Sequence, residues 1–419
     1  MTALRTMKRY WMAPLLAAPM ACEPGEVRDA RYEAPVIADS DETSASVSSS
    51  TPLTLGSAAF DATAAQKEAL YWVNTYRSRA GVQPVHELGT LNRAATAHAT
   101  YVLSNSDLYA GGGLSVHEQQ PGRPAYSGER FWDRLSGAGY AGEAFREVIA
   151  YQASPAAAVA HWLETVYHRL PLLHPESTHV GYGEASATGE YVNVLDLGTD
   201  PKKVTSVPHG VVWPPEGAVD VPLSWDGAET PAPPSPPDGF PSGPVITLQF
   251  QDRTNFVLHK TTIRDVAEDM ALGHVELSTE NDPNLSGDAA VAIYTHSPLL
   301  PGRTYKVVVE GQLNGTVFLR GWTFKTRESA SCDLAEQDCP VGKACYATTE
   351  TNLCAWAGIE REGATCEFQN DCAAGLTCID KSCRAFCSLD AGDAMACTHV
   401  CSDGAASKLP IPGTGVCRR

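Results

Sequence analysis

The chain has 419 residues, which is too long for a single hydrophobic core, so two or three domains are expected. Hydrophobic residues make up 43% and charged residues 19%, a composition that is typical of globular proteins and excludes a disordered chain or a coiled coil. A formal net charge of −18 excludes the basic surface that binds nucleic acid or anionic lipid headgroups. We therefore expect no nucleic-acid partner.

Residues 1–22 have the form of a bacterial export signal. Lys8 and Arg9 precede an apolar run that is too short to span a bilayer. The run ends at Cys22 and resembles a lipoprotein signal with Cys22 as the lipidated residue; ordinary cleavage and secretion is the alternative. The segment predicts an exported protein, either in the cell envelope or outside the cell. Any contact with a membrane is expected only through the N-terminal lipid anchor.

Residues 23–54 are rich in serine and acid and poor in large apolar side chains. Such a segment buries too little apolar surface to offset the entropy of ordering it. It is predicted to be a disordered linker.

Residues 55–200 form the first predicted domain, with helices early and strands late. Thr63 and Gln66 form a capping box at the start of the first helix. Apolar residues at helical or alternating spacing then predict helices over 63–80 and 91–103, a helix that begins at Pro155, and strands over 180–183 and 191–195. This order predicts an α+β domain.

Residues 207–328 form the second predicted domain. Eleven prolines between Pro208 and Pro244 exclude a helix there. Beyond them apolar residues alternate with polar ones over 246–250, 305–309 and 322–326, which predicts an all-β sandwich. The segments 300–305 and 322–326 resemble bacterial immunoglobulin-like domains.

Residues 332–417 hold twelve of the thirteen cysteines. Clustered cysteines in so short a segment predict a small disulfide-rich domain, because units of this size lack a core of their own. A zinc site is the alternative, but no Cys-x-x-Cys pair is present. The spacing of the first four cysteines is echoed by the next four, which indicates an internal repeat; the pairing stays open. The predicted disulfide cysteines are Cys332, Cys339, Cys345, Cys354, Cys366, Cys372, Cys378, Cys383, Cys387, Cys397, Cys401 and Cys417.

A series of short motifs in the first domain resembles the bacterial type of the CAP family, the group of cysteine-rich secretory proteins, antigen 5 and pathogenesis-related-1. The motifs are Val73–Gly81, Ser115-Val116-His117, Glu147–Tyr151, Tyr167-His168-Arg169 and Gly181-Tyr182-Gly183. The resemblance implies an α-β-α sandwich for this domain. It also implies a cleft lined by His117, Glu147 and His168, with Glu164 as a second carboxylate.

Three interpretations of these side chains stay open. Two imidazoles and a carboxylate suit a divalent metal such as zinc, with His117 and His168 as ligands, or a hydrogen-bonded set that orients a ligand. A purely structural polar cluster is the third interpretation. Outside this group, His98 is predicted to be a packed core residue, and His161, His174 and His179 are predicted to be surface groups.

The leading functional hypothesis is a binding or interaction module at the cell surface, for an apolar ligand or a protein partner that the sequence does not identify. The chain lacks a complete nucleophile–base–acid set, which favours binding over turnover, so catalytic residues are not assigned. A divalent metal such as zinc is the one cofactor that the sequence suggests. The alternative is a metal-dependent, peptidase-like hydrolase with Glu147 as general base. A spacer or adhesin with a vestigial cleft is a third hypothesis.

Overall fold

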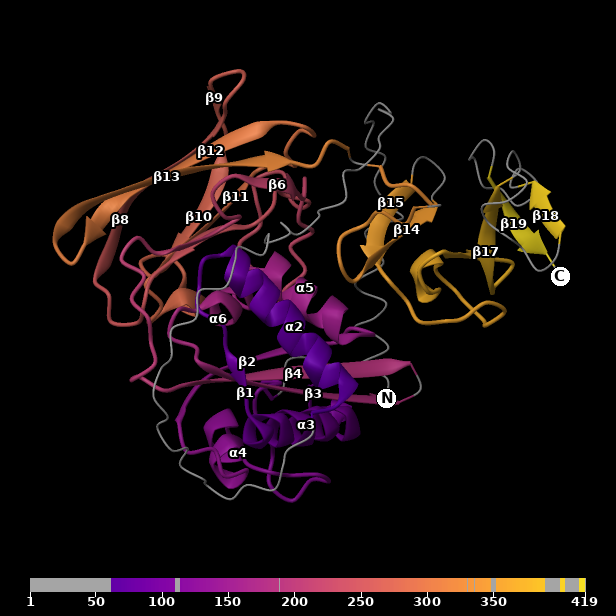
Figure 1. Cartoon of the computed structure of the whole chain (residues 1–419), viewed down its shortest axis with the longest axis horizontal. Coiled ribbons are helices and arrows are strands. Elements are labelled where there is room, and N and C mark those ends of the chain that lie inside the picture. Colours follow the sequence, from indigo (N-terminus) through magenta and orange to yellow (C-terminus); the bar gives the residue numbers. More distant parts are fainter. Residues whose placement is uncertain are drawn as a thin grey trace, which may run out of the picture.

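The computed structural model describes residues 62–109, 114–187, 189–329, 331–334, 336–347, 352–388, 400–403 and 414–418. These residues form an α+β domain, a β-rich region and a cysteine-rich region, in chain order (Figure 1). The predicted signal and linker at 1–54, with Cys22, lie outside the described residues, as does Cys397. Within the described part of the chain, no helix has both the length and the apolar character that a membrane crossing needs.

The α+β domain contains one mixed four-stranded sheet in the order β1-β3-β4-β2. Its elements are α2 (Ala64–Arg79), β1 (His86–Glu87), α3 (Gly89–Ser104), η2 (Ser106–Tyr109), α4 (Phe131–Gly137), β2 (Glu143–Ala150), α5 (Pro155–Glu164), α6 (Arg169–Leu173), β3 (His179–Ala187) and β4 (Glu190–Thr199). The predicted mixture of helices and strands is confirmed. Helices cover both faces of the sheet: α2 and α5 lie on one face and α3 on the other (Figure 1).

The helix starts follow from local hydrogen bonding. The Thr63 hydroxyl accepts the Gln66 N–H at 3.2 Å, and the Gln66 side chain accepts the Thr63 N–H at 2.9 Å, so the predicted capping box is confirmed. The Ser154 hydroxyl caps α5 by accepting the Ala157 N–H at 3.2 Å, and Pro155 takes the first helical position, where no N–H is needed.

Two glycines set the distance between α3 and the sheet. A Cβ atom on Gly181 would lie 2.2 Å from the Leu91 carbonyl carbon, and one on Gly183 would lie 2.0 Å from the Thr96 nitrogen. Both neighbours are backbone atoms of α3. The helix therefore rests directly on β3, which fixes the position of the side chains that α3 contributes.

The β-rich region contains two sheets, β10-β11-β7-β5 and β6-β13-β12-β8-β9. Its elements are β5 (Val211–Trp213), β6 (Ala218–Val221), β7 (Ile246–Gln249), β8 (Phe256–Asp265), β9 (Met270–Ala271), β10 (His274–Ser278), η3 (Pro283–Leu285), β11 (Ala290–Thr295), β12 (Thr304–Leu313) and β13 (Thr316–Thr326). Alternate residues of both sheets share one hydrophobic core, which includes Leu248, Val307 and Trp322. The alternation in the sequence thus marks the buried face of β12 and of the second half of β13, whereas every residue of β7 is buried.

The cysteine-rich region consists of short hairpins held by disulfides. Its elements are β14 (Lys343–Ala347), β15 (Asn352–Trp356), η4 (Gln369–Asp371), β16 (Leu376–Ile379), β17 (Ser382–Ser388), β18 (Val400–Asp403) and β19 (Thr414–Arg418). The bonded pairs are Cys332–Cys345, Cys339–Cys354, Cys366–Cys378 and Cys372–Cys383. Cys387 and Cys417 each take part in a disulfide as well.

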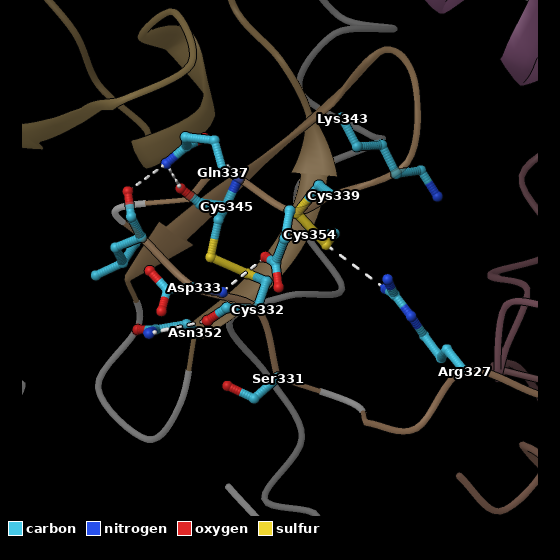
Figure 2. The surroundings of a disulfide bond; sticks show 12 residues. Arg327, Ser331, Cys332, Asp333, Gln337, Cys339, Lys343, Cys345, Asn352 and Cys354 are labelled. Atoms are coloured by element: carbon cyan, nitrogen blue, oxygen red, sulfur yellow. Dashed lines mark hydrogen bonds between the residues drawn. A yellow bond between two sulfur atoms is a disulfide. The ribbon is translucent and has the colours of Figure 1, made fainter. Parts of the chain in front are cut away.

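The disulfide prediction is confirmed for ten of the twelve cysteines, and the internal repeat has a structural counterpart. In each set of four cysteines the first pairs with the third and the second with the fourth. Figure 2 shows the first set, where an Arg327 Nη1 donor reaches the Cys354 sulfur at 3.7 Å. Arg327 directly follows β13, so this contact joins the β-rich region to the first hairpin.

The three regions pack against one another through apolar and polar contacts, and Val166 and Leu170 share a hydrophobic cluster with residues of the β-rich region. Arg146 pairs with Asp288 at 2.8 Å, and the Tyr167 hydroxyl donates to Asp282 at 2.7 Å. Glu164 pairs with Lys343 of the cysteine-rich region at 2.8 Å. The regions therefore form one continuous packed body.

The surface predictions for three histidines are wrong, since each is buried. His161 packs edge-on against Trp356 of the cysteine-rich region, with ring centroids 5.4 Å apart. His174 lies 3.2 Å from Asp252 of the β-rich region. His179 bonds to the Tyr140 hydroxyl at 3.0 Å. Later regions of the chain cover His161 and His174, whereas His179 is covered within its own domain.

Candidate functional site

The predicted site residues His117 and Glu147 are brought together on the α3 side of the sheet. Glu147 lies on β2 with a side chain that is 1% exposed. One carboxylate oxygen is 2.8 Å from His117 Nδ1, and the other accepts an Arg134 Nη2 hydrogen bond at 2.6 Å. Arg134, on α4, is also buried and donates to the His117 carbonyl at 3.1 Å. Arg134 thus binds both the Glu147 carboxylate and the backbone of the loop that carries His117.

A second carboxyl lies beside Glu147. Asp196 is its partner in the β2–β4 register and is fully buried. Burial, and then the negative charge of Glu147, raise the pKa of Asp196. Burial also opposes ionisation of Glu147, but His98, His117 and Arg134 outweigh it and lower the pKa of that carboxyl. Of the two carboxyls, Glu147 is therefore the one that ionises first.

His98 is a packed core residue, as predicted. Its ring has no exposure, and Nε2 donates to the Val116 carbonyl at 3.0 Å while Nδ1 accepts from the Gln119 amide at 2.9 Å. Burial lowers the pKa of His98 to about 4. This ring is therefore neutral at neutral pH and supports the loop that carries His117.

His117 is the exposed member of the group, with 41% of its side chain accessible. Because Glu147 is ionised, Nδ1 of His117 donates to it, and the remaining lone pair lies on Nε2. An imidazole oriented by a carboxylate in this way presents Nε2 as a hydrogen-bond acceptor or a metal ligand. His117 thus presents Nε2 at the surface, on a ring that the buried Glu147 carboxylate holds in place.

The structure gives His168 a different carboxylate partner. His168 Nδ1 lies 2.8 Å from Glu229, which comes from the proline-rich segment and has no side-chain exposure. The same carboxylate accepts the N–H groups of Val166, Tyr167 and His168 at 2.8, 2.6 and 3.1 Å. His168 is therefore held by the β-rich region, with only 13% of its side chain exposed.

Glu164 also has a partner away from His117 and Glu147. Its carboxylate pairs with Lys343, and the ammonium of that lysine lies 4.8 Å from the centroid of the Trp356 ring. Of the four predicted site residues, the structure thus joins His117 with Glu147 and gives His168 and Glu164 partners in the later regions.

The described residues contain three clusters with spacing that suits a metal ion, and none includes His117 or His168. Two of them consist largely of disulfide cysteines. The third joins His174, Glu176 and Asp252, but His174 Nδ1 accepts the Glu176 N–H at 3.2 Å, which places the ring proton on Nε2, the nitrogen that faces Asp252. Arg146 already supplies a positive charge to Asp252.

Three residues that matter at these sites received no role from the sequence. The sequence does not show that Arg134 is buried against Glu147, because the fold brings the two residues together. Asp196 lies in a strand, and nothing in the sequence shows that this acid is buried opposite Glu147. Glu229 has no feature that separates it from the neighbouring acids Asp226 and Asp238.

When the sequence is compared with known protein families, the segment that matches lies in the α+β domain. Residues 70–195 match the model of the CAP, or cysteine-rich secretory protein, family, so the chain contains a CAP domain. A search of curated proteins finds no match.

Similar solved structures include an outer surface protein from Borrelia burgdorferi, with 16% identity over 32% of this chain and 92% of that one, and a TM-score of 0.27. An extracellular protein with an SCP domain from Bacillus anthracis is 21% identical over 32% of this chain and 40% of that one, with a TM-score of 0.26. A venom allergen-like protein of Schistosoma mansoni is 10% identical over 33% of this chain and 90% of that one, with a TM-score of 0.25.

Proposed function

We propose that this CAP-domain protein is exported and acts as a binding module at the cell surface, with the exposed face of His117 as its contact point for an apolar ligand or a protein partner. The disulfides of the cysteine-rich region support export, because such bonds persist in oxidising compartments. In the same proposal Cys22 carries a lipid anchor, and the β-rich region is an immunoglobulin-like spacer.

The observation that carries the proposal is the contrast between His117 and its supports. Its imidazole is exposed, whereas Glu147, Arg134 and His98 beneath it are buried and bonded to one another or to the loop. A rigid support of this kind lowers the entropy cost of binding at the one side chain that solvent reaches. The arrangement therefore suits recognition through Nε2.

The hydrolase alternative is less well supported by this geometry. A general base must reach a proton on water or substrate, directly or through one water. Both oxygens of Glu147 are taken, by His117 and Arg134, and the side chain is almost fully buried. The geometry therefore suits Glu147 as an orienting group and not as the base.

The test compares binding of the labelled full chain to intact cells of the strain that produces it. His117→Ala is expected to weaken cell binding about tenfold, the equivalent of about 1.4 kcal/mol. The control is His209→Ala, a substitution at an exposed histidine outside the site, and it should bind like the native chain. Equal binding by all three proteins would favour the vestigial cleft. A zinc titration of the same proteins tests the alternative, which requires stoichiometric zinc that His117→Ala removes.

A further inference from the structure

The disulfide between Cys339 and Cys354 differs from its neighbours in its surroundings. Among the four pairs that the described residues complete, it is the one in which both cysteines are partly exposed. The other three pairs each contain at least one buried cysteine, and the buried cysteines are Cys332, Cys345, Cys366, Cys372 and Cys383. A thiol in solution therefore reaches the Cys339–Cys354 bond more easily than the other three.

A guanidinium lies against one sulfur of this bond. Arg327 Nη1 donates to Cys354 Sγ at 3.7 Å (Figure 2). The Arg327 side chain is only 12% exposed, so solvent and salt screen its charge weakly. A neighbouring arginine stabilises a thiolate, and a thiol of low pKa leaves a disulfide faster. Cys354 is therefore the favoured leaving group when this bond breaks.

A carboxylate lies near the other sulfur. One Asp338 oxygen is within 4.8 Å of Cys339 Sγ. This carboxylate also accepts the Asp333 N–H at 2.7 Å, which holds it in place. Its negative charge disfavours a thiolate on Cys339. Charges of opposite sign at the two ends thus distinguish the sulfurs: Cys339 suits the position that is attacked, and Cys354 suits the position that leaves.

From the exposure of the bond and these two charges, we infer that Cys339–Cys354 is a thiol-exchange site for a small external dithiol. The first thiolate forms a bond to Cys339 Sγ, the protein S–S bond breaks, and its electron pair leaves on Cys354 Sγ beside Arg327. The second thiolate then attacks the external sulfur of this mixed disulfide and releases Cys339. The dithiol loses two electrons and two protons and becomes a disulfide, while the two cysteines become thiols.

Reduction at this site would act on a joint between regions. Cys339 precedes the loop before β14, and a Cβ atom on Gly342 of that loop would lie 2.5 Å from the Ala157 Cα on α5. Cys354 lies on β15, two residues before Trp356, which also packs against α5. The bond therefore ties together two segments that contact the CAP domain. Its reduction should loosen their docking, an effect that goes beyond the proposed function.

The first test identifies the bond and the sulfur that react. The native full chain is treated with limiting glutathione, free thiols are blocked with iodoacetamide, and the products are located by peptide mass spectrometry. The early product should carry glutathione on Cys339 and the iodoacetamide label on Cys354. The other three described pairs should react at least about tenfold more slowly. Earlier reaction of one of those pairs, or glutathione mainly on Cys354, would overturn the inference.

The second test changes the charge beside the leaving sulfur. Arg327→Gln should slow exchange about tenfold, whereas Arg327→Lys should keep most of the native rate. Asp220 lies 3.5 Å from the Arg327 guanidinium and offsets part of its charge, so Asp220→Asn should speed exchange. The matched control is Arg264→Gln, because Arg264 pairs with Asp269 within the β-rich region; it should react like the native chain.

A purely structural contact predicts the opposite sign for Arg327→Gln, because its loss would uncover the bond and speed reduction. An equal or faster rate for that variant would therefore overturn the inference. Hydrogen exchange of the selectively reduced chain measures docking, and amides of α5 and β15 should exchange faster than in the native chain. Unchanged exchange would contradict the effect on docking. His117→Ala should leave thiol exchange unchanged, so this inference and the proposed function fail separately.

Discussion

The ring of His161 shows how the docked regions change the chemistry of a single residue. It projects from α5 against Trp356, and burial lowers its pKa to about 3. The pKa of a histidine in an unfolded chain is about 6.5. Between that pH and about pH 3, the unfolded chain therefore binds more protons at His161 than the folded chain does. Acid therefore favours unfolding here: the contribution of neutral His161 is complete above about pH 6.5 and declines as the pH falls toward 3.

We expect His161→Phe to reduce the acid sensitivity of the protein. Between about pH 6 and 4, its free energy of unfolding should fall less steeply than that of the native chain, by up to about 1.4 kcal/mol per pH unit. Urea titrations at several pH values measure this slope. His209→Phe, at an exposed position, should keep the native slope. Parallel profiles for the native chain and His161→Phe would contradict the burial argument.

For single residues, the sequence predicted burial correctly where neighbours in the same helix cover the side chain. It failed where another region covers it. His98 was correctly assigned to the core, because its neighbours at helical spacing are apolar and cover it locally. His161 and His174 were assigned to the surface because the residues that cover them, Trp356 and Asp252, lie far away in the chain. The spacing of apolar residues in a helix cannot predict burial by a later region, because it depends only on residues within that helix.

At the scale of elements, the packing of α3 on β3 is the contact that positions the Glu147 group. Gly183 and Gly181 remove the side chains that would separate the two elements, and α3 then places His98 against the loop of His117. The two glycines were noted in the sequence as part of a family motif. Their role becomes clear only from the backbone atoms of α3 that a Cβ atom would meet.

Gly183→Ala is expected to destabilise the protein by about 3 kcal/mol or more, because the added methyl group would meet backbone atoms, which do not rotate away. Chemical denaturation measures the change. Gly137→Ala provides the matched control: its Cβ would lie 3.8 Å from the Ser127 carbonyl oxygen, an ordinary contact. That variant should stay within about 1 kcal/mol of the native chain. A tolerated Gly183→Ala would show that α3 moves on β3 more easily than the structure implies.

Helix starts and buried strand faces were predictable because they depend on neighbours in sequence. The Thr63 capping box and the alternation around Val307 are examples. The partners of the site residues were not predictable in this way. The resemblance to the CAP family implied that His168 shares a cleft with His117, whereas the structure pairs His168 with Glu229, a residue outside the matched segment 70–195.

At the scale of the whole molecule, Glu229 links the CAP domain to the β-rich region through four hydrogen bonds. Its carboxylate accepts three successive backbone N–H groups and contacts the His168 ring. A group with this many donors is satisfied only by a carboxylate, because an amide would turn an NH₂ group toward one of them. The two regions are therefore expected to unfold together in one transition.

Glu229→Gln keeps the size of the side chain but leaves at least one buried donor without an acceptor. We expect a loss of about 2–4 kcal/mol in the free energy of unfolding, and faster proteolysis of the proline-rich segment as the two regions separate. Glu216→Gln is the control, since Glu216 bonds to Thr323 at an exposed position of the β-rich region. It should change stability by less than about 0.5 kcal/mol. If both variants unfold like the native chain, Glu229 does not hold the two regions together, and their docking must depend on the Arg146–Asp288 pair and on the apolar packing of Val166 and Leu170 against the β-rich region.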